Sequence, residues 1–100
     1  MSVSALDAFP EKARDLVMEG NAWEKNGNDV AAAFSYLKAL EISPGMPEIY
    51  QRLGMTFEAL DMNVAATRVF ERYLAIGMAT KAELEDVRQR LMDLRVKSAA

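Results

Sequence analysis

The feature that most constrains the fold of this chain is an internal repeat with a period of 34 residues. A fixed period between about 20 and 50 residues is typical of repeat arrays, in which each unit buries its apolar face against the next. At this offset the chain predicts two copies, over residues 13–46 and 47–79. The coinciding pairs are Leu16 with Tyr50, Gly20 with Gly54, Trp23 with Phe57, Ala32 with Ala66, Tyr36 with Phe70, Ala39 with Tyr73 and Leu40 with Leu74.

Each copy is expected to form two helices joined by a short turn, and no strand is expected. Apolar residues recur at helical spacing, and glycine, proline or asparagine stands at each break. In the first copy Gly27 and Asn28 end one helix, and Asn28 or Asp29 caps the next. The expected helices cover about 9–26, 29–42, 47–60, 64–76 and 80–97, with Asp7 capping the first and a turn at Asp61-Met62-Asn63.

The order of residues within each copy resembles the tetratricopeptide repeat, whose pattern is W-x2-L-G-x2-Y…A-x3-F…P. Pro44 stands where the family has its closing proline, whereas the second copy has Met78 there. The resemblance extends over about residues 13–96, after an N-terminal segment of residues 1–12. It implies an all-α fold, an α-α superhelix of two helical hairpins plus a capping helix, with right-handed stacking and one domain overall.

The last expected helix, residues 80–97, differs from the two copies at one informative position. Thr80-Lys81-Ala82-Glu83 has the form of a capping box, and Leu84 and Val87 continue the repeat pattern. Arg88, however, stands where both copies have glycine. Because the glycine lets the two helices of a hairpin approach closely, an arginine there predicts that no further helix packs on that face. This helix is therefore expected to cap the array with a polar surface.

The core is expected to follow the repeat pattern. Gly20 and Gly54 occupy the same position of each copy, where a larger side chain would overpack the crossing of two helices. Aromatic side chains contribute the largest apolar areas to a core. The aromatic residues assigned to the core are Trp23, Tyr36, Phe57, Phe70 and Tyr73.

Charge and composition exclude several classes of function. A net charge of −3 argues against general affinity for nucleic acid or anionic membranes, which requires clustered Lys and Arg. The chain has no His and no Cys, which removes the commonest general base and the thiolate ligands of zinc sites. No enzyme activity, cofactor or metal is expected. The carboxylates weighed as a catalytic pair, and assigned instead to helix caps and solvated faces, are Glu24, Asp29, Asp61, Glu85 and Asp86.

The sequence also bears on location. No apolar run reaches the ~20 residues that a membrane-spanning helix needs. The first twelve residues, MSVSALDAFPEK, lack the basic region and the long apolar stretch of a secretory signal. If the chain is complete, these features predict a cytoplasmic protein.

By the same resemblance, the first helix of each hairpin lines a concave groove that binds a peptide. Met18 and Met55 fall in the middle of the expected groove, and methionine suits a surface that adapts to its partner. Basic residues are expected on one side of the groove and acidic residues on the other. The groove residues are Arg14, Val17, Met18, Asn21, Lys25, Glu48, Gln51, Arg52, Met55, Asp86 and Gln89, with Ala59, Ala82, Met92 and Asp93 beside them.

The family's clamp for the C-terminal carboxylate of a peptide needs lysine and asparagine on this face. Asn21 matches an asparagine of the clamp, but Val17 stands where the lysine belongs and Arg52 where a second asparagine belongs. The clamp is therefore not expected in this chain.

A second surface offers an alternative site. On the second helix Phe34 and Leu37 are apolar, where the second copy has Arg68 and Glu71. Exposed apolar patches mark interfaces, so these two residues are expected either to be covered by Leu6 and Phe9 folding back or to form a homodimer or partner contact.

The leading functional expectation is a non-catalytic protein–protein interaction module, an adaptor that binds a peptide segment of a protein partner in its groove. One alternative is a small secretion or assembly chaperone that holds an aggregation-prone segment. Another is a self-associating structural protein that uses the surface around Phe34 and Leu37.

Overall fold

The structure, a computed structural model, describes residues 10–77 and 80–99, and every regular element in these ranges is a helix. The all-α fold predicted from the repeat is therefore confirmed. The five helices are α1 (Glu11–Lys25), α2 (Asp29–Ile42), α3 (Pro47–Ala59), α4 (Asn63–Ile76) and α5 (Lys81–Ala99).

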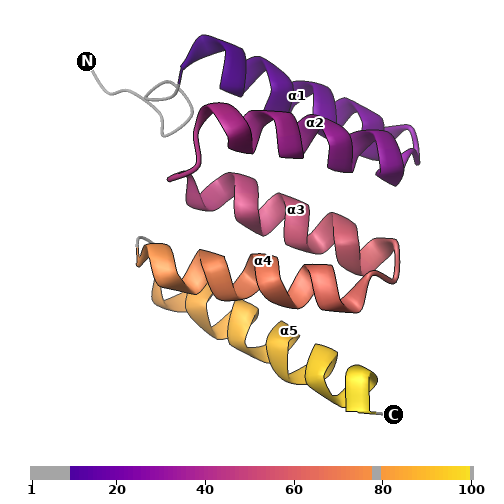
Figure 1. The fold of residues 1–100 in the computed structure, drawn as a ribbon, viewed down its shortest axis with the longest axis vertical. Coiled ribbons are helices and arrows are strands. Elements are labelled where there is room, and N and C mark those ends of the chain that lie inside the picture. Colours follow the sequence, from indigo (N-terminus) through magenta and orange to yellow (C-terminus); the bar gives the residue numbers. More distant parts are fainter. Residues whose placement is uncertain (1–9, 78–79, 100) are drawn as a thin grey trace.

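The helices follow one another in space in the order in which they occur in the chain (Figure 1). α1 and α2 form one antiparallel hairpin, α3 and α4 form a second, and α5 packs against α4. α2 also packs against α3, which joins the two hairpins into one array. The expected arrangement of two hairpins followed by a single helix is thus observed.

The turns inside the two hairpins repeat the same backbone conformation. Gly27 has a φ of +77°, and Asp61, 34 residues later, has a φ of +59°. Asn28 caps α2, since its side-chain oxygen accepts a hydrogen bond from the Ala31 N–H at 3.0 Å. α4 has Met62 at the corresponding position, with no side-chain cap. α4 begins at Asn63, which was expected to lie in the turn.

The end of α4 and the start of α5 agree with the sequence signals. α4 ends at Gly77, whose φ of +72° is left-handed and favours glycine. The Thr80 hydroxyl accepts a hydrogen bond from the Glu83 N–H at 3.2 Å, and the Glu83 carboxylate accepts one from the Thr80 N–H at 3.1 Å. This reciprocal pair is the predicted capping box.

Both packing glycines lie where two helices cross. A Cβ atom added to Gly20 would lie 2.5 Å from Cε1 of Tyr36, and one added to Gly54 would lie 2.6 Å from Cε1 of Phe70. Ordinary contacts of a Cβ atom are 3.4–4 Å. Only glycine therefore permits this spacing of α1 and α2, and of α3 and α4.

The core follows the repeat pattern with one exception. Tyr36, Phe70 and Tyr73 are at most 1% exposed, and Phe57 is 9% exposed. Trp23, which the repeat pattern assigns to the core beside them, is 37% exposed. The prediction that Trp23 is a core residue is therefore wrong. Its indole is larger than the phenyl ring of Phe57, and tryptophan side chains are rarely covered completely.

Several expectations concern residues outside the described ranges. They are the cap at Asp7, the fold-back of Leu6 and Phe9, and the role of Met78 at the end of the second copy.

Candidate interaction surface

The surface of interest is formed by the first helices of the array, α1, α3 and α5. Polar side chains connect these helices directly, although the closest helix packing runs through α2 and α4. We call their shared exposed side the first-helix face.

The connection between α1 and α3 is centred on Asn21. The Asn21 carboxamide oxygen accepts a hydrogen bond from the Tyr36 hydroxyl at 2.6 Å and a second from Nη1 of Arg52 at 2.9 Å. Nε of Arg52 also lies 3.1 Å from a carboxylate oxygen of Glu48, one turn earlier on α3. The Arg52 guanidinium therefore binds to groups of the protein itself, whereas the sequence assigned it to a peptide ligand.

A second α1–α3 connection lies one turn further along. The Thr56 hydroxyl lies 2.7 Å from Oε1 of Glu24 and 2.8 Å from the backbone carbonyl of Arg52. Thr56 is only 2% exposed. The buried hydroxyl thus has two acceptors in reach, and the contact places the Glu24 carboxylate beside α3.

α3 and α5 are connected in the same way. Nη1 of Arg90 lies 2.8 Å from a carboxylate oxygen of Glu58, and its Nε lies 2.9 Å from Asp86 on the same helix. The hydrogen bond to Asp86, with the nearby Glu58 carboxylate, raises the pKa of the Arg90 guanidinium above its ordinary value. The α1–α3 pair Glu24–Thr56 and the α3–α5 pair Glu58–Arg90 each join residues 32 positions apart.

Most predicted groove residues are accessible on this face. Met18, Lys25, Met55, Asp86 and Gln89 are exposed. Gln89 donates a hydrogen bond to Asp93 at 3.1 Å. The residues that are partly covered are Arg14, Asn21, Glu48, Gln51 and Arg52.

Val17 corrects the predicted groove. It is 0% exposed and belongs to the core, together with Ala13 one turn before it and Gly20 one turn after it. The buried stripe of α1 is thus centred closer to Val17 than to Leu16, which is only partly covered. A completely covered valine contacts no ligand in this arrangement.

The three first helices each expose one methionine. Met18 on α1 is 57% exposed, Met55 on α3 is 42% exposed and Met92 on α5 is 59% exposed. Successive members are 37 residues apart, three more than the repeat period. Each therefore lies about 4.5 Å further along its helix than the previous one and about 60° around it, given ~1.5 Å and ~100° per residue. The predicted groove included Met18 and Met55 and placed Met92 only beside it.

The outer side of α2 exposes the alternative surface. Val30, Phe34 and Leu37 are 55%, 62% and 39% exposed. They recur at helical spacing on the side opposite Ala32, Tyr36 and Ala39, which are completely buried. We call these three exposed residues the α2 strip.

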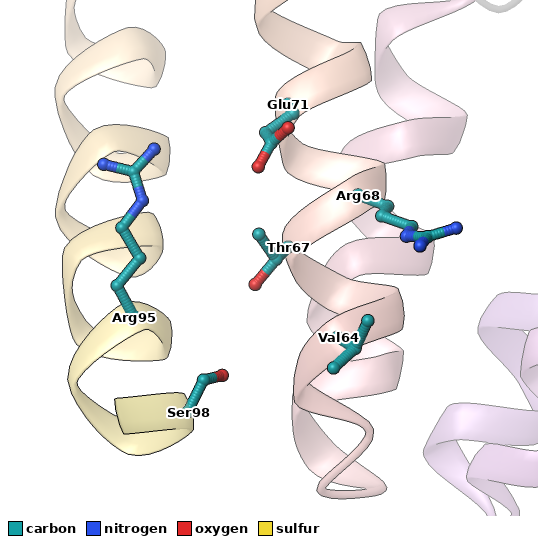
Figure 2. A pocket seen from close by; sticks show the side chains of 6 residues that line it. All are labelled: Val64, Thr67, Arg68, Glu71, Arg95 and Ser98. Carbon is teal, nitrogen blue, oxygen red and sulfur yellow. The ribbon is translucent and has the colours of Figure 1, made fainter. Parts of the chain in front are cut away.

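A hollow of about 530 Å³ between α4 and the C-terminal half of α5 has no counterpart in the sequence predictions. In Figure 2, Thr67 and Glu71 project from α4 toward α5, Arg95 and Ser98 line the opposite wall, and Arg68 points away from α5. α4 and α5 diverge toward the C-terminal end of α5 (Figure 1). Sequence periodicity could not reveal the hollow, because it assigns faces to helices and does not give the angle between them.

Two buried tyrosines, Tyr36 and Tyr73, have raised pKa values. Burial raises the pKa of Tyr36 to about 12, with the Glu24 carboxylate adding to the effect. Burial also raises the pKa of Tyr73 to about 12, and its hydroxyl donates a hydrogen bond to Glu83 at 2.9 Å. Both phenols stay protonated at neutral pH, so they act as hydrogen-bond donors within the core and not as bases.

The described part of the chain lacks two kinds of feature. It contains no group of three or more acidic side chains placed to hold a metal ion. It also contains no helix with the length and apolar character needed to cross a membrane.

No protein-family model matches the chain, and no curated protein matches its sequence. The assignment of function therefore depends on the surface itself and on the resemblance of the repeat pattern.

Proposed function

We propose that this protein is a non-catalytic interaction module, an adaptor that binds a peptide segment of a protein partner on its first-helix face. The 34-residue period, the packing glycines and the two helical hairpins support a tetratricopeptide-like scaffold. Scaffolds of stacked helical pairs present extended binding surfaces. The resemblance thus gives the general mode of binding, and the residues of the face give its chemistry.

The observation that carries the proposal is that each first helix exposes one methionine; we call Met18, Met55 and Met92 together the methionine row. Each comes from a different first helix, so together they extend across the whole array. Methionine side chains are flexible and polarisable, and they are used on surfaces that bind variable apolar segments. The row fits a peptide that crosses the three helices diagonally and places apolar side chains on successive methionines.

The charges on the first-helix face favour one orientation of the bound peptide. The basic residues Arg14 and Lys25 lie on α1, whereas the acidic residues Asp86 and Asp93 lie on α5. Arg52 contributes less than the sequence indicates, because Glu48 and Asn21 already bind its guanidinium. An acidic segment of the peptide is therefore expected near α1 and a basic segment near α5. Complementary charges of this kind act mainly on association rate and specificity.

The test is selection of binders from a library of random 15-residue peptides displayed on phage, followed by measurement of their affinity. Met55→Glu should weaken binding of the selected peptides at least tenfold, because it places a charge in the middle of the apolar row. Met62→Glu is the matched control, since Met62 is 47% exposed at the cap of α4 and lies outside the row.

Equal losses for the two variants, or a loss only for Met62→Glu, would contradict the proposal. Far-ultraviolet circular dichroism of both variants verifies that the fold is retained. Selected peptides should carry apolar residues, with acidic residues toward one end and basic residues toward the other.

A further inference from the structure

The α2 strip is an exposed apolar surface that the proposed function does not use. α2 buries Ala32, Tyr36 and Ala39 on one side and exposes the strip on the other. A helix that is apolar on all sides is normally covered on all sides. α2 therefore lacks a covering element on its outer side.

The repeat pattern does not require apolar residues at these positions. The counterparts of Phe34 and Leu37 in the second hairpin are Arg68 and Glu71, and both are exposed. The apolar outer side is thus mainly a property of the first hairpin, with Val64 of α4 as the one shared apolar position. An element that is present only beside the first hairpin explains this difference.

The size of the strip argues against a second copy of the chain as that element. A whole aromatic side chain covers about 150–250 Å², so the three partly exposed residues present on the order of 300 Å². A stable protein–protein interface needs about 800 Å² from each partner. A short segment of chain matches the exposed area better.

We propose that residues 1–9 cover the α2 strip. Leu6 and Phe9, with Val3, are apolar residues spaced three apart, and Asp7 is the only charged side chain of the segment. Lys38, one turn beyond Phe34, is exposed beside the strip and has the opposite charge. The segment therefore matches the strip in apolar character, in length and in charge.

The segment also reaches the strip. Because α1 and α2 are antiparallel, the start of α1 at Glu11 lies beside the end of α2 at Ile42 (Figure 1). Leu37 and Phe34 lie about 8 and 12 Å from that end, at ~1.5 Å per residue. Nine extended residues span up to about 30 Å, so even Val30 lies within range.

The absence of cysteine from the chain makes this proposal testable by disulfide formation. The double variant Leu6→Cys with Leu37→Cys is oxidised under dilute conditions, and the disulfide is detected by mass spectrometry after proteolysis. The matched control pairs Leu6→Cys with Glu71→Cys, since Glu71 is the repeat counterpart of Leu37. Both target positions are exposed, so neither substitution disturbs the core.

We expect an intramolecular Leu6–Leu37 disulfide to form at least tenfold faster than the Leu6–Glu71 disulfide, because the Cα atoms must come within about 7 Å. Equal rates would overturn the proposal. The single variants Leu37→Cys and Glu71→Cys are compared in parallel. Faster formation of a disulfide-linked dimer by Leu37→Cys than by Glu71→Cys would show that a second copy covers the strip, and would also overturn the proposal.

Discussion

Substitution of Gly54 by alanine tests whether the helix crossing in the second hairpin depends on the absence of a side chain. Intrinsic helix propensity alone predicts that the variant is more stable, by about 0.8–1.0 kcal/mol, because alanine is the better helix former. The packing of α3 on α4 predicts the opposite. The sign of the change therefore decides between the two effects.

The structure gives the size of the packing effect. An alanine Cβ at position 54 would lie 2.6, 2.7 and 2.9 Å from three ring atoms of Phe70, whereas ordinary contacts are 3.4–4 Å. Phe70 is 0% exposed, so its ring has no solvent side into which to move. Overpacking of this kind costs typically 1–3 kcal/mol. After subtraction of the propensity gain, Gly54→Ala should lower the free energy of unfolding by up to about 2 kcal/mol.

The assay is urea unfolding followed by far-ultraviolet circular dichroism, supported by thermal melting. A loss of about 2 kcal/mol lowers Tm by roughly 8–16 °C in a domain of this length, and a smaller loss lowers it in proportion. Gly45→Ala is the control, because an added Cβ there meets no atom within 4 Å. It should change the free energy of unfolding by less than about 0.5 kcal/mol.

A double-mutant cycle shows whether the effect comes from Phe70. Phe70→Leu removes the ring atoms that the new Cβ contacts, so Gly54→Ala should cost at least ~1 kcal/mol less in that background. If Gly54→Ala raises Tm in the otherwise unchanged protein, the close crossing of α3 and α4 is refuted.

Three further predictions follow from individual side chains. Trp23→Ala should lower the free energy of unfolding, measured with urea, by about 2–3 kcal/mol. This is below the ~3–5 kcal/mol of a fully buried tryptophan, because the indole is 37% exposed. A loss above about 3 kcal/mol would contradict the observed exposure. Arg90→Ala should cost about 1 kcal/mol by breaking the α3–α5 contact with Glu58. A variant as stable as the parent would contradict a stabilising role of this contact. Burial raises the pKa of Tyr36 and of Tyr73 from 10.0 to about 12, so their contribution to stability is complete below pH 10 and is lost as the pH rises toward 12. Absorbance titration at 295 nm should show that both phenols ionise at a higher pH than a free tyrosine. Ionisation of both near pH 10 would contradict their burial.

The sequence predicted the features that depend on one residue type at one position of the repeat. Gly20 and Gly54 indicated the helix crossings because no other residue lacks a side chain. Thr80 and Glu83 indicated the start of α5 because the capping box is local in sequence. These signals require no knowledge of how distant helices are oriented.

The connections between first helices could not be predicted in the same way. Thr56 and Arg90 occupy the same position of the repeat but are different residue types, and their partners Glu24 and Glu58 lie 32 residues away. Helical periodicity assigns such residues to a polar face, but long side chains select their partners only when the distance and angle between helices are known. Arg52 was therefore assigned to a ligand, although the protein itself binds its guanidinium.

Helical periodicity also could not predict the exact centre of the buried stripe of α1. Val17 and Leu16 are neighbours on the helix, and the wheel alone does not show which of them faces the core. The structure buries Val17 completely and leaves Leu16 partly covered. A shift of one position in the stripe thus removed one residue from the predicted groove.

The most direct test of the central claim is methyl NMR of the protein labelled with ¹³C at its methionine methyl groups. The chain has seven methionines, and assignment by substitution separates the row from the control Met62. On addition of a peptide selected from the random library, we expect shifts at Met18, Met55 and Met92 and none at Met62. Shifts at Met62, with the three methionines of the row unchanged, would contradict binding on the first-helix face.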